Sequence, residues 1–144
     1  MTNADRRRNL GWWFVLLSAL GAALIWFVFI GQYADGREIE GQCFGNVPPG
    51  AVGTEDSSAY EADITFLPPG RQCTYAATDG GTITTQTGES RVPIAFLATG
   101  LGLLALVLTW VFRRRVTAMQ QVLTHSALLF LGLGWATIAI YANG

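Results

Sequence analysis

Two cysteines are the residues of this chain best suited to covalent chemistry. Cys43 and Cys73 are its only cysteines, and they stand 30 residues apart with no histidine between them. A redox or nucleophilic thiol needs a close partner, such as the second cysteine of a C-x-x-C motif, or a nearby base. The spacing therefore favours a structural disulfide, which would stabilise this segment by about 3–4 kcal/mol through loop closure. A reactive thiol and an unpaired or intermolecularly paired cysteine are the alternatives.

His125 is the only histidine, and it lies near the start of an apolar run that covers residues 122–141. Ionisable side chains inside a membrane are functional candidates by default. A haem or proton-transfer role would need a second ligand or a carboxylate at membrane depth. The apolar runs contain neither, so another subunit would have to supply it. We expect a neutral His125 that is hydrogen-bonded to a neighbouring helix.

Carboxylates are concentrated in residues 31–91, which hold nine of the ten acids, including Glu55, Asp56, Glu61 and Asp63. Hard cations take six or more oxygen ligands in a defined geometry, and zinc takes about four nitrogen or sulfur ligands. The segment has neither pattern, so we expect a solvated acidic face. Phosphate-binding loops, nucleophile elbows and basic grooves for nucleic acid are also missing from the sequence. We therefore expect no catalytic residues, no cofactor or metal, no nucleic-acid partner and no enzymatic activity.

Three long apolar runs must position these residues. Each has about the 20 residues that a helix needs to cross the hydrocarbon core of a bilayer. Lipid offers no hydrogen-bond partner to the backbone, so each run must be helical. We predict transmembrane helices over residues 10–30, 92–112 and 122–141. The fold class is therefore a membrane all-α protein with three transmembrane helices and a small β-rich, disulfide-stapled extracytoplasmic loop between the first two.

Two arginine triplets predict the orientation in the cell membrane. They make up six of the nine basic residues, and the chain has no lysine. Cytoplasmic flanks carry excess positive charge, so we place residues 1–9 and 113–121 inside, and residues 31–91 and 142–144 outside. We expect the triplets to contact the anionic headgroups of the inner leaflet. Their members are Arg6, Arg7, Arg8, Arg113, Arg114 and Arg115.

The outer segment has the pattern of a small β-meander. Apolar and polar residues alternate over 60–66, as in a strand with one buried face. Residues 72–76 and 82–87 predict two further strands, with Pro- and Gly-containing turns at 68–70 and 79–81. Residues 45–58 are rich in Gly, Pro and Ser, so we expect irregular structure there.

Pairs of small residues four apart mark possible helix contact faces in lipid. We expect them to pack within the molecule, with a dimer or partner face as the alternative. The pairs are Ser18 with Ala22, Ala98 with Gly102, and Gly132 with Ala136.

The stretch from Leu67 to Tyr75 resembles a segment of small actinobacterial integral membrane proteins of unknown function. Their pattern is an aromatic residue, Pro-Leu-Gly, two variable residues, Cys, one residue, and Tyr or Trp. Here Leu67 replaces the aromatic residue and Pro69 replaces the Leu. The resemblance implies an outward Cys loop in a small envelope protein and brings no known activity with it.

We therefore expect a non-enzymatic accessory or scaffold subunit of a larger cell-envelope membrane complex. Its partners would be the bilayer and either other membrane subunits or further copies of itself. The alternative is an oligomeric subunit that contributes to a channel or transport path. Against that alternative, no predicted span contains Asp, Glu, Lys or Arg, which such paths usually need.

Overall fold

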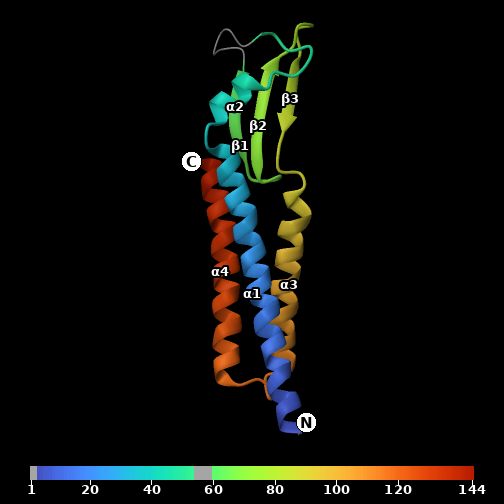
Figure 1. Cartoon of the computed structure of the whole chain (residues 1–144), viewed down its shortest axis with the longest axis vertical. Coiled ribbons are helices and arrows are strands. Elements are labelled where there is room, and N and C mark those ends of the chain that lie inside the picture. Colours follow the sequence, from blue (N-terminus) through green and yellow to red (C-terminus); the bar gives the residue numbers. More distant parts are fainter. Residues whose placement is uncertain (1–2, 54–59) are drawn as a thin grey trace. The chain divides into compact units, whose positions relative to one another are not determined.

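Three long helices, one short helix and a small antiparallel sheet form the described part of the chain in the computed structural model (Figure 1). The structure describes residues 3–53 and 60–144, with side chains from Leu10 onward. The helices are α1 (Asn3–Gly36), α2 (Ile39–Gly45), α3 (Arg91–Val111) and α4 (Ala118–Asn143). The strands are β1 (Tyr60–Thr65), β2 (Gly70–Ala76) and β3 (Thr82–Gln86).

The three predicted spans are confirmed as helices. Those long and apolar enough to cross a membrane are Leu10–Gly36, Arg91–Val111 and Ala118–Asn143 among the described residues. The first continues past its predicted end at Ile30 as far as Gly36, because residues 31–36 contain no proline to end the helix. Glu38 then adopts a left-handed conformation, with φ of 71°, between α1 and α2. These helices are compatible with a multi-pass membrane protein.

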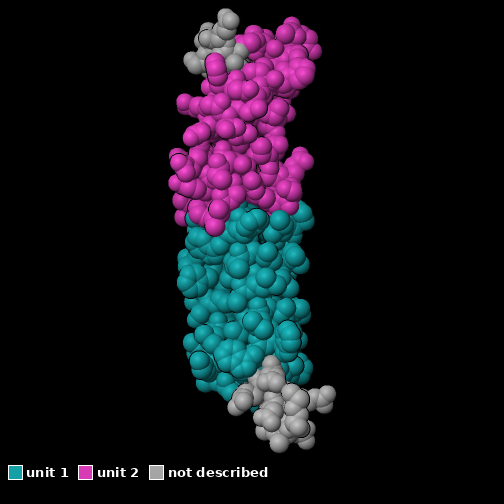
Figure 2. Space-filling model, in the orientation of Figure 1, with its two compact units in different colours: residues 1–28, 93–137 teal, residues 29–92, 138–144 magenta. Residues whose placement is uncertain are grey.

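The chain divides into two compact units, which Figure 2 colours separately. Unit 1 comprises residues 1–28 and 93–137, and unit 2 comprises residues 29–92 and 138–144. In unit 1, parts of α1, α3 and α4 lie side by side as a bundle (Figure 1). In unit 2, the sheet and α2 are grouped with the last turns of α1 and α4.

Small side chains allow the helices of unit 1 to approach closely. A Cβ added to Gly21 of α1 would lie 2.7 Å from the carbonyl oxygen of Ala98 on α3. A Cβ on Gly134 of α4 would lie 2.6 Å from Ile25 of α1. Large apolar side chains instead cover the outside of the bundle, including Phe27. This distribution is typical of helices that associate in lipid, where packing and hydrogen bonds hold them together.

Two of the three predicted small-residue pairs are used inside the bundle. Ser18 and Ala22 are buried, as are Ala98 and Gly102. These four residues therefore serve the intramolecular packing that we expected.

The third pair behaves differently. Gly132 and Ala136 are exposed on α4. A Cβ added to Gly132 would meet no described atom within 4 Å. The prediction of intramolecular packing is therefore wrong for this pair, because the α4 surface that carries it faces away from α1 and α3.

The predicted β-meander is confirmed in unit 2. The strand order is β1-β2-β3 and both pairings are antiparallel. In the central strand, Cys73 stands opposite Ala62 of β1 and Thr85 of β3. The turn between β2 and β3 contains Gly80 with φ of 89°, a conformation that glycine adopts without strain.

Helix α2 was not predicted. Two of its seven residues are glycines, which disfavour helix by about 1 kcal/mol each. Tertiary contacts compensate, because α2 carries the buried Cys43 into a core with Cys73 and Tyr75. Ile39 and Val47, at either end of this segment, also pack against that core.

Candidate functional site

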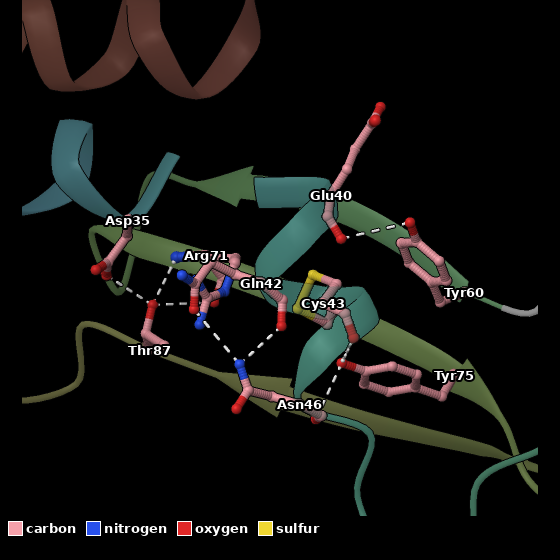
Figure 3. Close-up of a disulfide and its surroundings, with 10 residues drawn as sticks. Asp35, Glu40, Gln42, Cys43, Asn46, Tyr60, Arg71, Tyr75 and Thr87 are labelled. Atoms are coloured by element: carbon pink, nitrogen blue, oxygen red, sulfur yellow. Dashed lines mark hydrogen bonds between the residues drawn. A yellow bond between two sulfur atoms is a disulfide. The ribbon is translucent and has the colours of Figure 1, made fainter. Parts of the chain in front are cut away.

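The disulfide forms the centre of unit 2 and confirms the predicted pairing. It joins Cys43 of α2 to Cys73 of β2, with their Cα atoms 5.7 Å apart (Figure 3). Both cysteines are buried, and no described cysteine is free. A buried, bonded sulfur pair fits a structural cross-link and does not provide an accessible thiolate.

Tyr75 completes this centre, although the sequence analysis assigned it no role. Its hydroxyl donates a hydrogen bond to the carbonyl oxygen of Cys43 at 2.8 Å (Figure 3). Its ring centroid lies 6.3 Å from that of Tyr60 on β1. Cys73 and Tyr75 are two residues apart on one strand, so they occupy the same face of the sheet. This two-residue spacing could have predicted from the sequence that Tyr75 packs beside the disulfide.

An ion pair links two helix ends within unit 2. Arg91 Nη1 donates to Asp35 Oδ2 at 2.6 Å and to the carbonyl oxygen of Pro69 at 3.0 Å. The Thr87 hydroxyl donates to the same Asp35 oxygen at 2.8 Å. Both charged side chains are 21% exposed, and theirs is the only ion pair that the described residues form. The arrangement connects α1, the β1–β2 turn and the start of α3.

Gln32 extends this polar network into the interior of unit 2. Its side chain is fully buried, and Nε2 donates to the carbonyl oxygens of Thr65 at 3.0 Å and Ile138 at 3.4 Å. Gln86 in turn donates to the Thr65 hydroxyl at 2.7 Å. The Gln32 Oε1 atom has no hydrogen-bond partner among the described residues. Gln32 lies beyond the first predicted span, which ends at Ile30, and no pattern in the sequence indicates its burial.

A polar cavity of about 440 Å³ lies beside the ion pair. Its lining mixes carboxylates with guanidinium groups, so it has no single sign of charge. The residues that line it are Ala34, Asp35, Arg37, Glu38, Gln42 and Arg71. No group of three or more residues able to hold a metal ion occurs in the described part of the chain.

The acidic residues singled out in the sequence do not converge. Glu61 and Asp63 are exposed on the same face of β1, opposite Thr74 and Gln72 of β2. Glu55 and Asp56 lie outside the described residues. Glu61 and Asp63 therefore face solvent, whereas Asp35 of the same acidic segment is held in the ion pair with Arg91.

His125 is exposed on α4, and the expected hydrogen bond to a neighbouring helix is wrong. Its Nδ1 atom lies 2.7 Å from the carbonyl oxygen of Gln121, one turn earlier on the same helix. Gln121 Nε2 donates to the carbonyl oxygen of Arg113 at 3.3 Å. The histidine therefore uses a backbone carbonyl of its own helix as its hydrogen-bond partner.

A second cavity, of about 230 Å³, brings His125 together with one predicted arginine in unit 1. It lies between α3 and α4, and its lining combines polar with apolar side chains. The residues that line it are Leu106, Thr109, Trp110, Arg113, Gln121 and His125.

The second arginine triplet, Arg113, Arg114 and Arg115, is exposed to solvent in the turn between α3 and α4. The guanidinium carbon of Arg115 lies 5.9 Å from the ring centroid of Phe112. The side chains of Arg6, Arg7 and Arg8 lie outside the described ones.

No protein-family model, curated protein or solved structure matches the chain. The described geometry comprises three apolar helices packed through small residues, and a small unit held together by a disulfide and an ion pair.

Proposed function

We propose that this protein is a non-enzymatic integral membrane protein that serves as an accessory or scaffold subunit of a larger complex in the cell envelope. The open small-residue face of α4, defined by Gly132 and Ala136, carries this proposal. The segment from Leu67 to Tyr75, with its resemblance to actinobacterial membrane proteins, agrees with an envelope location.

The α4 face suits a helix from another membrane subunit. Gly132 and Ala136 are four residues apart, so they share one side of the helix and let a second backbone approach. Leu129 and Ile140 flank them and are 71% and 72% exposed. Two small side chains between two large ones give a shallow depression into which a partner helix can pack. The other two predicted pairs, Ser18 with Ala22 and Ala98 with Gly102, are already buried inside the bundle.

The orientation proposed for the chain puts both arginine triplets in the cytoplasm. Trp13 and Trp110, near the triplets in the sequence, are exposed, and exposed tryptophans favour the membrane interface. A disulfide persists in an oxidising compartment, which supports an extracytoplasmic position for Cys43 and Cys73. The N-terminus would then lie inside and the C-terminus outside.

The polar groups of unit 2 support a structural role. Asp35 and Arg91 neutralise each other, and the cysteines are bonded to each other. These residues hold α2, the sheet and the helix ends together. Unit 2 would therefore present a stable extracytoplasmic surface to the partner complex.

Purification from native membranes in mild detergent tests the proposal. We expect the chain to co-purify in fixed stoichiometry with larger membrane subunits. Replacing Gly132 and Ala136 together with leucine should abolish this co-purification. A matched double replacement with leucine at Val107 and Val111, two large residues that are exposed on α3 and four positions apart, should leave it intact.

Other outcomes would contradict the accessory role. A homo-oligomer that conducts ions in liposomes would favour the channel alternative instead. A monomer that conducts nothing and co-purifies with nothing would refute both. Equal co-purification of the two double variants would show that the α4 face is not the contact surface.

A further inference from the structure

We propose that the cavity between α3 and α4 in unit 1 binds the phosphate group of an anionic phospholipid headgroup. The inference rests on the membrane insertion in the proposed function, and not on the accessory role. It makes the expected contact between arginines and the inner leaflet more specific, because it assigns that contact to one defined cavity.

Arg113 supplies the positive charge of the site. It is the only one of the three arginines in this turn that lines the cavity. Among the described side chains, no carboxylate pairs with it. A guanidinium group offers several N–H donors in a planar fork that matches two phosphate oxygens. Basic pockets between helices at the cytoplasmic side are suited to acidic lipid headgroups.

Thr109 gives the second, independent indication of a ligand. Its side chain is only 3% exposed and lines the cavity. The Thr109 hydroxyl oxygen has no hydrogen-bond partner among the described residues, although a buried hydroxyl normally has one. Threonines in membrane helices often bond to the carbonyl one turn earlier, as Thr124 and Thr137 do on α4. An oxygen of a bound headgroup would satisfy the Thr109 hydroxyl.

His125 faces the cavity with one ring nitrogen available. Its Nδ1 must carry the hydrogen of the bond to Gln121, because a carbonyl oxygen can only accept. Nε2 is then an acceptor in the neutral ring and a donor in the protonated ring. It can therefore bond to a headgroup hydroxyl in the first state and to a phosphate oxygen in the second.

The apolar part of the lining suits the rest of a lipid. Trp110 lies on α3 close to Arg113, and Leu106 lies about one helical turn farther away from Arg113. In the proposed orientation, Arg113 reaches headgroup level and Leu106 reaches the hydrocarbon. The cavity volume of 230 Å³ is below the roughly 300–1,000 Å³ of sites that enclose a drug-sized molecule. It is therefore suited to a headgroup whose acyl chains remain in the bilayer.

Lipid titration followed by native mass spectrometry tests the site on the full chain in mild detergent. The probes are dioleoyl phosphatidylglycerol, dioleoyl phosphatidylcholine and inorganic phosphate. We expect phosphatidylglycerol to bind about tenfold more tightly than phosphatidylcholine, because only the former has a net charge to pair with Arg113. Inorganic phosphate should compete weakly, because it has no acyl chains.

Matched variants distinguish a specific lipid-binding site from a general attraction between the arginines and anionic lipids. Arg113→Gln should weaken phosphatidylglycerol binding by about tenfold or more, through loss of charge-assisted hydrogen bonds. Arg114→Gln removes the same charge from the same turn and should change it by less than about threefold. Thr109→Val, which keeps the side-chain shape, should weaken binding, and Thr109→Ser should preserve it.

Three outcomes would overturn the assignment. They are equal losses in Arg113→Gln and Arg114→Gln, equal affinity for the two lipids, and binding of inorganic phosphate as tight as that of phosphatidylglycerol. Flotation with vesicles serves as the control for folding and insertion, since each variant must still float. A chain that fails to float would refute the proposed membrane location, and not the site alone.

Discussion

Opening the Cys43–Cys73 bond should destabilise unit 2 strongly. The bond joins residues that are 30 apart in the sequence. For a closed loop of this size, the loss of chain entropy in the unfolded state stabilises the folded state by about 3.7 kcal/mol at 25 °C. The sheet of unit 2 has only three strands, so this cross-link should supply much of its stability.

Native-state hydrogen exchange on the full chain in detergent measures this free energy directly. The amides of β2, Gly70–Ala76, should exchange several-hundredfold faster in the reduced protein than in the oxidised protein, since each 1.4 kcal/mol corresponds to about tenfold. Amides of α3 within unit 1 provide the internal reference, and their exchange should not change.

Comparing the reduced protein with an alanine variant separates the stability contributed by the cross-link from that contributed by packing of the sulfur atoms. The reduced wild-type protein keeps both buried sulfurs, whereas the variant with alanine at Cys43 and Cys73 loses them. The alanine variant should therefore be less stable than the reduced protein by about another 1–2 kcal/mol. An acceleration of β2 exchange below about tenfold on reduction would refute the loop-closure argument.

Tyr75→Phe probes the same core with the disulfide intact. It removes the hydrogen bond to the Cys43 carbonyl and leaves that acceptor without its 2.8 Å partner. We expect a loss of about 1–2 kcal/mol in the opening free energy of β2. Tyr60→Phe is the matched control, because its hydroxyl makes only an exposed 3.4 Å contact with Glu40, and it should cost less than about 0.5 kcal/mol. Equal losses of opening free energy in the two variants would show that burial of the Tyr75 hydrogen bond does not contribute to the stability of β2.

Two further predictions concern the ion pair and the helix packing. Arg91→Gln should lower the opening free energy of unit 2 by about 1–3 kcal/mol, because Asp35 loses a charge-assisted partner in a half-buried site. Arg37→Gln, at an exposed position, is the control and should change that free energy by less than about 0.5 kcal/mol. Native-state hydrogen exchange measures both values. Gly21→Ala should lower the thermal stability of the helical bundle by about 1–3 kcal/mol, because its Cβ would press on a backbone carbonyl of α3. Gly100→Ala, which meets no atom within 4 Å, should be neutral or stabilising by circular dichroism, and equal losses at both glycines would contradict the packing argument.

Local patterns predicted most of the secondary structure. The apolar runs identified the long helices because a bilayer-spanning length of uncharged residues has few other solutions. The alternation over residues 60–66 identified β1, and the Gly-containing turn at 79–81 identified the hairpin between β2 and β3. Helix α2 escaped prediction because its two glycines oppose helix formation and only its contacts with the sheet compensate.

Partners in space were harder to predict than elements along the chain. Asp35 and Arg91 are 56 residues apart in the sequence, and no local pattern joins them. His125 was assigned a neighbouring helix as partner, but its direction depends on how α4 is rotated about its axis. Gly132 and Ala136 have the same spacing as Ala98 and Gly102, yet only the latter pair is buried. The rotation of each helix, which the full set of packing contacts determines, decides these cases.

The amino-acid sequence was enough to predict three apolar helices and a three-stranded meander, and to favour a disulfide between the two cysteines. These follow from hydrophobicity, turn chemistry and residue type, which act over a few residues at a time. Packing in three dimensions was needed to show which of the predicted small-residue pairs are buried and that Tyr75 bonds to the Cys43 carbonyl. It was also needed to show that Thr109, Arg113 and His125 line one cavity. Such groupings join side chains from different elements, and their contacts exist only once the elements have packed.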